Sequence, residues 1–264
     1  MKLRRLTSAL ATAGLVLGIS LFGSATATAQ EAPVAYVALG DSYASGVGAG
    51  NYGNSGSCKR SSRAYPELWA NANSPASFHF TACSGARTTD VLSGQMGPLN
   101  AGTTLVTISI GGNDAGFADT MTTCVLQSTN SCLSRVAQAR QYIENQLPSR
   151  LDTVYSAIRA QAPNAHVVVL GYPQMYQLGS CWVGIGDTSR AAINAASDDL
   201  STVTAKRAAD HGFTYGDVRP AFSGHEICSS NSWLHSLTWP IGDSYHPTAA
   251  GQSNGYYPVM RNLA

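Results

Sequence analysis

Short segments rich in apolar and β-branched residues alternate along this chain with longer segments of helical periodicity. The five strand-like segments span residues 34–39, 78–82, 104–110, 166–171 and 213–218. Alternation of this kind is typical of βαβ units, in which parallel strands are covered by helices on both faces. We therefore predict a single α/β domain, with a doubly wound, flavodoxin-like, three-layer fold around a mostly parallel five-stranded sheet.

The expected helices follow from apolar residues spaced by three, four or seven positions. One such face is formed by Val136, Ile143, Leu147, Leu151, Val154 and Ile158. Pro148 interrupts this stretch, so we expect the helix to be kinked or divided there. Further helices are expected over residues 188–210 and 247–262.

The first 29 residues have the pattern of a secretory signal peptide. Three basic residues among the first five precede an apolar stretch over residues 10–22, and Ala27-Thr28-Ala29 has the small residues of a cleavage site. The apolar stretch is shorter than the ~20 residues that a membrane-spanning helix needs. We expect export and cleavage after Ala29, which leaves residues 30–264 as one domain.

The charge of the chain gives no sign of a nucleic-acid partner. The sequence has 16 Lys and Arg and 15 Asp and Glu, and loss of the signal peptide removes three of the basic residues, which leaves a net charge of −2. No basic patch or charge block is present, so we expect no nucleic-acid binding. We expect a soluble, secreted monomer.

All six cysteines follow the signal peptide, which indicates three disulfides in an exported protein. Six cysteines allow 15 pairings. We expect pairing in sequence order, Cys58 with Cys83, Cys124 with Cys132 and Cys181 with Cys228. No CxxC pair with the spacing of a zinc site occurs, so we expect no structural metal.

Ser42 directly follows the first predicted strand, in the stretch Gly40-Asp41-Ser42-Tyr43-Ala44-Ser45-Gly46. In open α/β sheets, ligands bind beyond the carboxyl ends of the strands. A hydroxyl group there can point into a crevice, beside backbone N–H groups that favour an anion. Asp-Ser after a strand is also an ordinary turn or helix cap, so this stretch alone does not define a site.

Among the six histidines, His246 has the best-placed partner in the sequence. Asp243 lies three residues before it, just before the last predicted helix. Its carboxylate could accept the Nδ1 proton of the imidazole, which would leave Nε2 free to take a proton from a serine. The other five histidines lack a carboxylate placed in this way.

Four motifs of the chain resemble, in order, the four blocks of the SGNH (GDSL-type) hydrolases. They are Gly40-Asp41-Ser42, Gly85, Gly111-Gly112-Asn113-Asp114 and Asp243-x-x-His246. Each block alone is a weak signal, but four in order are a strong one. The resemblance spans about residues 36–262. With its six cysteines and the sequence Cys83-Ser84-Gly85-Ala86, the chain is most similar to the secreted actinomycete lipases and phospholipases A1 of that family.

This resemblance implies a serine ester hydrolase that needs no metal or organic cofactor. Ser42 would attack the ester carbonyl, and His246 would act first as base and then as acid. The backbone N–H groups of Ser42 and Gly85, with the side-chain amide of Asn113, would bind the oxyanion.

The resemblance leaves two partners open for the histidine. Asp243 is the usual choice in the family, and we expect it to orient His246. In some relatives of the secreted lipase type a backbone carbonyl fills this role, and here the carbonyl of Ser244 is the alternative.

The expected substrate is a lipid ester, either an acylglycerol or a phospholipid, the latter with phospholipase A1 activity. Two loops over residues 172–187 and 221–244 carry Trp182, Trp233 and Trp239, which also suggests transient contact with a lipid surface. An alternative is a carbohydrate O-acetyl esterase, because the same four blocks serve deacetylation.

Two other classes of protein agree less well with the sequence. The α/β-hydrolase elbow G-x-S-x-G is not matched, because Ala44 occupies its fifth position. A non-catalytic phosphate- or flavin-binding protein is a distant alternative, since the loop after the first strand of a flavodoxin-like fold can bind phosphate.

Overall fold

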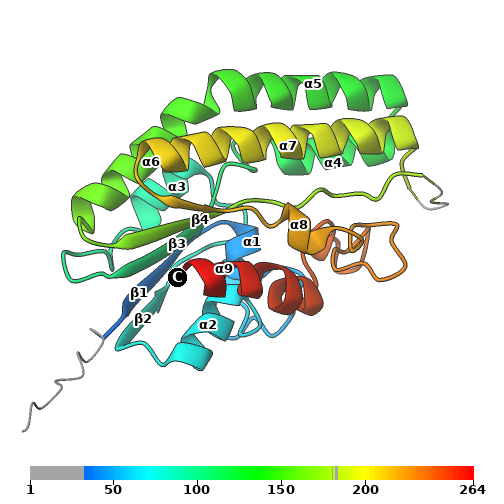
Figure 1. Ribbon diagram of the computed structural model, residues 1–264. Coiled ribbons are helices and arrows are strands. Elements are labelled where there is room, and N and C mark those ends of the chain that lie inside the picture. The colour runs from blue at the N-terminus through cyan, green and yellow to red at the C-terminus, as the bar shows by residue number, and fades with distance from the viewer. Residues whose placement is uncertain (1–32, 180, 182–183) are drawn as a thin grey trace, which may run out of the picture. The chain divides into compact units, whose positions relative to one another are not determined.

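The sheet of this protein has five strands, all parallel, in the order β2-β1-β3-β4-β5. A computed structural model describes residues 33–179, 181 and 184–264, so the expected signal peptide and Trp182 lie outside the described residues. The strands are β1 (Ala35–Gly40), β2 (Ser77–Phe80), β3 (Leu105–Ser109), β4 (His166–Leu170) and β5 (Thr214–Gly216) (Figure 1). The predicted fold class is confirmed.

Strand β1 occupies the position in the sheet where the strand order reverses. It pairs with β2 on one side and with β3 on the other, where Gly40 lies opposite Ser109. The chain moves from β1 outward to β2 and then returns past β1 to β3, β4 and β5. This order is that of flavodoxin-like folds, in which the crevice for a ligand opens between the carboxyl ends of the strands at the reversal point.

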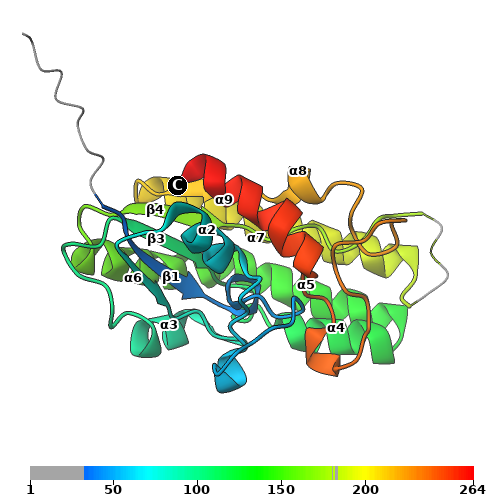
Figure 2. The same ribbon diagram turned by 90° about the horizontal axis from the view of Figure 1, so that it is seen from below.

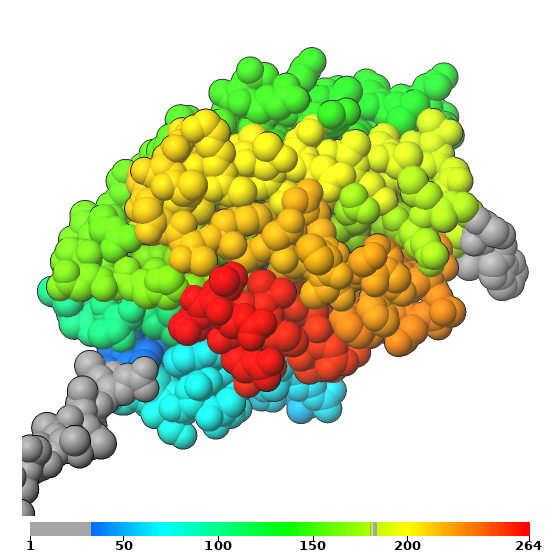
Figure 3. All heavy atoms as spheres, in the orientation of Figure 1, coloured from blue at the N-terminus to red at the C-terminus, as the bar shows by residue number. Residues whose placement is uncertain are grey.

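Helices cover both faces of the sheet (Figures 1 and 2). On one side lie α3 (Thr88–Gly94), α4 (Phe117–Leu126), α5 (Thr129–Asn145), α6 (Leu147–Gln161) and α7 (Asp187–Asp210). On the other lie α2 (Tyr65–Asn73), a π-helical segment (Gly251–Tyr256) and α9 (Tyr257–Leu263). The space-filling view shows the C-terminal segment, in red, directly against the segment of α2, in cyan (Figure 3).

The short helices lie near the carboxyl ends of the strands and in the loops. They are α1 (Ser42–Ser45), α8 (Arg219–Phe222) and two 3-10 turns, Gly56–Cys58 and Ile241–Asp243. The expected long helix before β4 is divided at Gln146, which ends α5 and precedes α6. Pro148 lies in the first turn of α6, where its missing N–H costs no hydrogen bond.

Helix α4 was not predicted from the sequence. Several threonines and the absence of charged residues at its end weaken its helical pattern, and its first turn follows Gly116 in a left-handed conformation. A usable signal is nevertheless present, because Phe117, Met121 and Val125 are spaced by four and four. This helix proves to form one wall of the cleft described below.

The structure contains three disulfides, Cys58–Cys83, Cys124–Cys132 and Cys181–Cys228, in the expected sequence order. The first joins the loop after α1 to the turn after β2, and the second joins α4 to α5. Within the part of the chain that the structure describes, no helix is both long and apolar enough to span a membrane.

Candidate active site

Ser42 is the first residue of α1, at the carboxyl end of β1. The preceding Gly40 has a φ of +128°, and a Cβ atom there would lie 2.6 Å from the carbonyl oxygen of Ser109, so only glycine fits. The Asp41 N–H donates to that same oxygen at 3.0 Å, and the Asp41 side chain caps α1 through the N–H of Tyr43 at 2.9 Å. These contacts form a sharp turn that places Ser42 at the crevice.

The side chains of Ser42 and His246 meet although they lie 204 positions apart in the sequence. The distance from His246 Nε2 to Ser42 Oγ is 2.8 Å. On the other side of the ring, Nδ1 lies 2.9 Å from the carbonyl oxygen of Ser244. Because a carbonyl oxygen can only accept, Nδ1 carries the proton and Nε2 is left to accept the proton of the Ser42 hydroxyl.

The carboxylate of Asp243 does not contact the imidazole, so the expectation that it orients His246 is wrong. Its two oxygens accept from Lys59 Nζ and from the hydroxyl of Tyr52, each at 3.0 Å. The physical reason is the backbone between the two residues: Tyr245 has a φ of +63°, and this turn directs the carbonyl of Ser244 toward the ring. The alternative partner, the Ser244 carbonyl, occupies the orienting position.

Burial keeps His246 in its neutral form. Desolvation lowers the pKa of the imidazole to about 4, and the hydrogen bond to Ser244 and the negative charge of Asp243 oppose this shift. One edge of the ring remains open to the cleft, where it meets Ser42. A neutral imidazole at neutral pH is the form that can accept a proton.

Gly85 and Asn113 lie in the turns that follow β2 and β3, and both line the same cleft as Ser42 and His246. Gly85 has a φ of +78°, a conformation that side chains other than glycine rarely adopt. Asn113 donates one amide hydrogen to the carbonyl oxygen of Ala86 at 3.0 Å, which leaves its second amide hydrogen available. Among the described residues, the N–H groups of Ser42 and Gly85 have no acceptor.

The cleft above these groups has a volume of about 480 Å³ and mostly apolar walls. Helix α4 forms one wall with Phe117, Met121 and Leu126, and the loop before His246 forms another with Leu237 and Ile241. A smaller cavity of about 80 Å³ lies deeper, between α4, α5 and α7. The two spaces share Ser42, Asn113, Phe117 and Met121 in their walls, so the smaller cavity adjoins the cleft at the serine.

Neither of the two described tryptophans in these loops, Trp233 and Trp239, lines the cleft. Trp233 packs against the core and stacks on the ring of His225 at 3.5 Å, while Trp239 is 88% exposed. Aliphatic residues of the same loop line the cleft instead. Among the described residues, no group of three or more His, Cys, Asp or Glu side chains is placed to hold a metal ion.

A serine hydroxyl bonded to a neutral histidine, beside free backbone and amide N–H donors, is the arrangement typical of serine hydrolases. Comparisons with known proteins agree with this class. The sequence model of the GDSL-like Lipase/Acylhydrolase family matches residues 38–253 of the chain. Lipase 1 of Streptomyces coelicolor is 64% identical over 264 residues, which cover 98% of each chain.

Two crystal structures are similar to this protein along most of its length. One is an extracellular lipase from Streptomyces rimosus and the other is phospholipase A1 from Streptomyces albidoflavus NA297. Each is 63% identical with a TM-score of 0.87, over 88% of this chain and 100% of the other. The chain therefore belongs to the GDSL-like lipase/acylhydrolase family and is a carboxylic ester hydrolase.

Replacement of Asp243 by Asn should reduce kcat by less than about tenfold, since its carboxylate does not touch the imidazole, whereas a triad carboxylate is worth about 10⁴. Steady-state kinetics on a soluble ester measure the effect. Tyr52→Phe is the matched control, because it removes a hydrogen bond to Asp243 and keeps the charge. A loss of kcat by three or more orders of magnitude in Asp243→Asn, but not in Tyr52→Phe, would show that the carboxylate takes part in catalysis.

If His246 is the general base, the acidic limb of kcat/KM should lie near pH 4, because its lowered pKa keeps the imidazole unprotonated until the pH falls through that value. A pH profile, with circular dichroism to establish folding at each pH, measures this. The profile of an Asp41→Asn variant separates this limb from the titration of Asp41, whose burial raises its pKa to about 7. A limb centred at the ordinary histidine pKa of ~6.5 would contradict the described environment.

Proposed function

We propose that this protein hydrolyses carboxylic esters of lipids, either acylglycerols or phospholipids, with Ser42 as nucleophile and His246 as general base. The observation that carries the proposal is the 2.8 Å contact between Ser42 Oγ and His246 Nε2, at the end of an apolar cleft. Phospholipase A1 activity is included, because one of the two similar crystal structures is of a phospholipase A1.

The proposed reaction proceeds through an acyl-enzyme. Ser42 Oγ bonds to the ester carbonyl carbon while its proton passes to His246 Nε2. The carbonyl oxygen becomes an oxyanion, which the N–H groups of Ser42 and Gly85 and the amide of Asn113 stabilise; one such donor is worth about 10²–10³ in rate. His246 then gives its proton to the leaving alcohol oxygen as the ester bond breaks. In the second half of the reaction, water attacks the acyl-enzyme while His246 takes its proton. His246 then returns that proton to Ser42 Oγ as the carboxylic acid is released.

Each group in this scheme is suited to its role by its chemistry. The imidazolium that forms transiently is stabilised by the Nδ1–H bond to Ser244 and by the negative charge of Asp243. An amide such as Asn113 donates without titrating, so its contribution does not depend on pH.

A lipid substrate is supported by the walls of the cleft and of the cavity behind it. The residues that face this space from α4 and α5, such as Phe117, Met121 and Ile143, are apolar. Each methylene group of an acyl chain buried there gains ~0.8 kcal/mol. A carbohydrate ester, with its many hydroxyl groups, would leave those groups without hydrogen-bond partners against such walls.

Labelling with an organophosphonate ester, followed by peptide mapping, tests the nucleophile. We expect the label on Ser42, and no label and no esterase activity in Ser42→Ala. A second experiment compares acetyl and long-chain p-nitrophenyl esters and then phosphatidylcholine. We expect long chains to be preferred. Preference for acetyl esters together with no action on phospholipid would favour the O-acetyl esterase, and absence of any hydrolysis would reject the enzyme mechanism.

We further propose that the rim of the cleft touches the lipid surface transiently during turnover. Leu126, Leu237 and Ile241 belong to the cleft wall and are nevertheless 76%, 57% and 60% exposed. Trp239, between two of them in the sequence, is 88% exposed. Exposed apolar residues gathered around a cleft are typical of a binding surface.

Trp239→Ser should lower the rate on phosphatidylcholine vesicles at sub-saturating lipid by about three- to tenfold, because an apolar side chain of this size contributes ~1.5–3 kcal/mol when fully buried and less at an interface. The rate on a soluble short-chain ester should stay within twofold. Leu178→Ser is the matched control, since Leu178 is 51% exposed and lies outside the cleft walls. Equal losses on both substrates would contradict lipid contact.

Export and oligomeric state complete the proposal. We propose that residues 1–29 are removed on secretion and that residues 30–264 act as a monomer outside the cell. The sequence pattern of these residues supports export, as does the extracellular origin stated for the Streptomyces rimosus lipase. One chain supplies Ser42, His246, Gly85 and Asn113, so a monomer would hold the complete proposed site. The mass of the protein recovered from culture medium, and its elution volume, check both points.

A further inference from the structure

The hydroxyl of Tyr172 lies between the turn that carries Ser42 and the turn that carries Asn113. It donates to Asp41 Oδ2 at 2.5 Å and accepts the N–H of Gly112 at 3.3 Å. Asp41 immediately precedes Ser42, and Gly112 immediately precedes Asn113. Tyr172 itself follows β4 and belongs to none of the four sequence motifs.

We propose that Tyr172 is a positioning residue that holds the Asn113 amide at the correct distance from the Ser42 N–H for both to bind one oxyanion. The inference rests on the proposed function, because it assigns Tyr172 a role in that same site. Tyr172 does not itself touch the reacting atoms. It acts through the two turns that its hydroxyl joins.

The turn of Asn113 is tied on one side to the segment that carries Gly85. Asn113 donates to Ala86, and the Asp114 carboxylate accepts from the N–H of Thr88 at 3.0 Å and from its hydroxyl at 2.6 Å. These contacts set the distance between two of the three proposed oxyanion donors. They do not set the distance from Asn113 to Ser42.

On the side of Ser42, backbone pairing between β1 and β3 ends with the bond from the Asp41 N–H to Ser109. Beyond that bond the two chains diverge. Among the described residues, the N–H of Gly112 donates only to Tyr172. The tyrosine hydroxyl therefore links the turn of Ser42 to the turn of Asn113, through its hydrogen bonds to Asp41 and Gly112.

The ring of Tyr172 is packed in a way that fixes its hydroxyl. It contacts the ring of Tyr43 edge to face at 5.1 Å, and it is buried against Gly112. Asp41 is also buried, and its second oxygen is held by the N–H of Tyr43. Both partners of the hydroxyl are buried, and a buried polar group that loses its hydrogen bond is costly.

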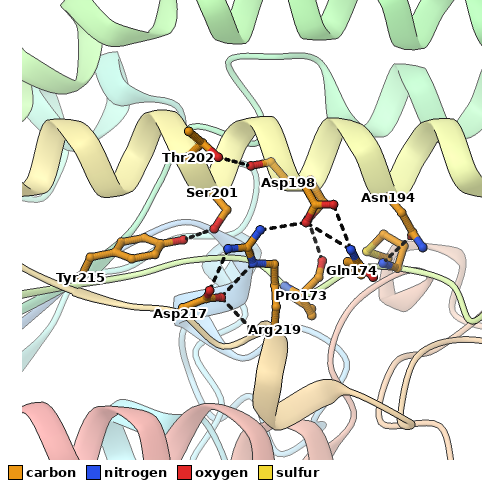
Figure 4. Close-up of polar contacts among 11 residues, drawn as sticks. Pro173, Gln174, Asn194, Asp198, Ser201, Thr202, Tyr215, Asp217 and Arg219 are labelled. Atoms are coloured by element: carbon orange, nitrogen blue, oxygen red, sulfur yellow. Dashed lines mark hydrogen bonds and ion pairs between the residues drawn. The ribbon is translucent and has the colours of Figure 1, made fainter.

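The segment that follows Tyr172 is tied to α7 by side-chain hydrogen bonds (Figure 4). Ser197 donates to the carbonyl of Pro173 at 2.8 Å, and Gln174 donates to Asp198 at 2.9 Å. Asp198 is also paired with Arg219 at 2.8 Å. A long helix thus supports the tyrosine, as positioning with tolerances below 1 Å requires.

Tyr172→Phe keeps the ring and removes the hydroxyl. We expect kcat per phosphonate-reactive serine to fall about ten- to a hundredfold, because misplacing an oxyanion donor forfeits part of the 10²–10³ that its removal costs. KM should change by less than about threefold, since Tyr172→Phe keeps the aromatic ring that lines the inner cavity and removes only the hydroxyl. Normalisation to reactive serine removes any contribution from unfolded protein.

Tyr36→Phe is the matched control. Tyr36 is fully buried, and its hydroxyl is bonded to Thr107 at 2.7 Å within the sheet, away from the turns. We expect its kcat to stay within twofold of wild type. Equal losses in both variants would show a general packing effect and would overturn the proposal.

A double-mutant cycle with Asn113→Ala tests whether Tyr172 acts through the amide. If it does, Tyr172→Phe should lower kcat by less than about twofold in the Asn113→Ala background. Losses that multiply would overturn the proposal. The two possible failures differ in their results. If the proposed function is wrong, wild-type protein hydrolyses no ester. If only this inference is wrong, wild type and Tyr172→Phe are both fully active.

Discussion

Backbone pairing at the end of β1 is the constraint on which the site depends. Gly40 lies opposite Ser109 of β3, the Asp41 N–H bonds to the Ser109 carbonyl, and on the other side the Cys83 N–H bonds to the Gly40 carbonyl at 3.0 Å. The chain segments that follow β1, β2 and β3 therefore begin next to one another at the same edge of the sheet. Because the strand order reverses at β1, the segments then separate and leave a crevice. Ser42, Gly85 and Asn113 meet there through the regular geometry of the sheet.

His246 reaches the same crevice by a different route, since it belongs to an irregular loop. Tyr245 holds a left-handed conformation that a tyrosine adopts at a cost of about 1–3 kcal/mol. The surrounding contacts offset that cost: the Tyr43 hydroxyl donates to the carbonyl of Tyr245 at 2.7 Å, and the backbone of His235 pairs with both Tyr245 and His246. Tyr43 lies one residue after Ser42, the proposed nucleophile, so the turn of the serine also supports the loop of His246, the proposed base.

The parts of this site that could be predicted from the sequence are those determined by local pattern. Alternating strands and helices predict the sheet, and residues that follow strand ends, such as Ser42, are brought together by its topology. The orientation of Asp243 could not be predicted, because it depends on one backbone dihedral at Tyr245. Tyr172 could not be found either, since its two contacts span 131 and 60 positions and no motif marks them.

Burial has the same electrostatic consequence on both sides of Ser42. Desolvation disfavours charge, so it lowers the pKa of His246 to about 4 and raises that of Asp41 to about 7. A neutral imidazole can accept the serine proton. A carboxyl group displaced toward its neutral form places less negative charge beside the proposed oxyanion site, and the hydrogen bonds from Tyr172 and Tyr43 limit that displacement. The burial that would suit an acyl chain thus also favours the protonation states that the proposed ester cleavage requires.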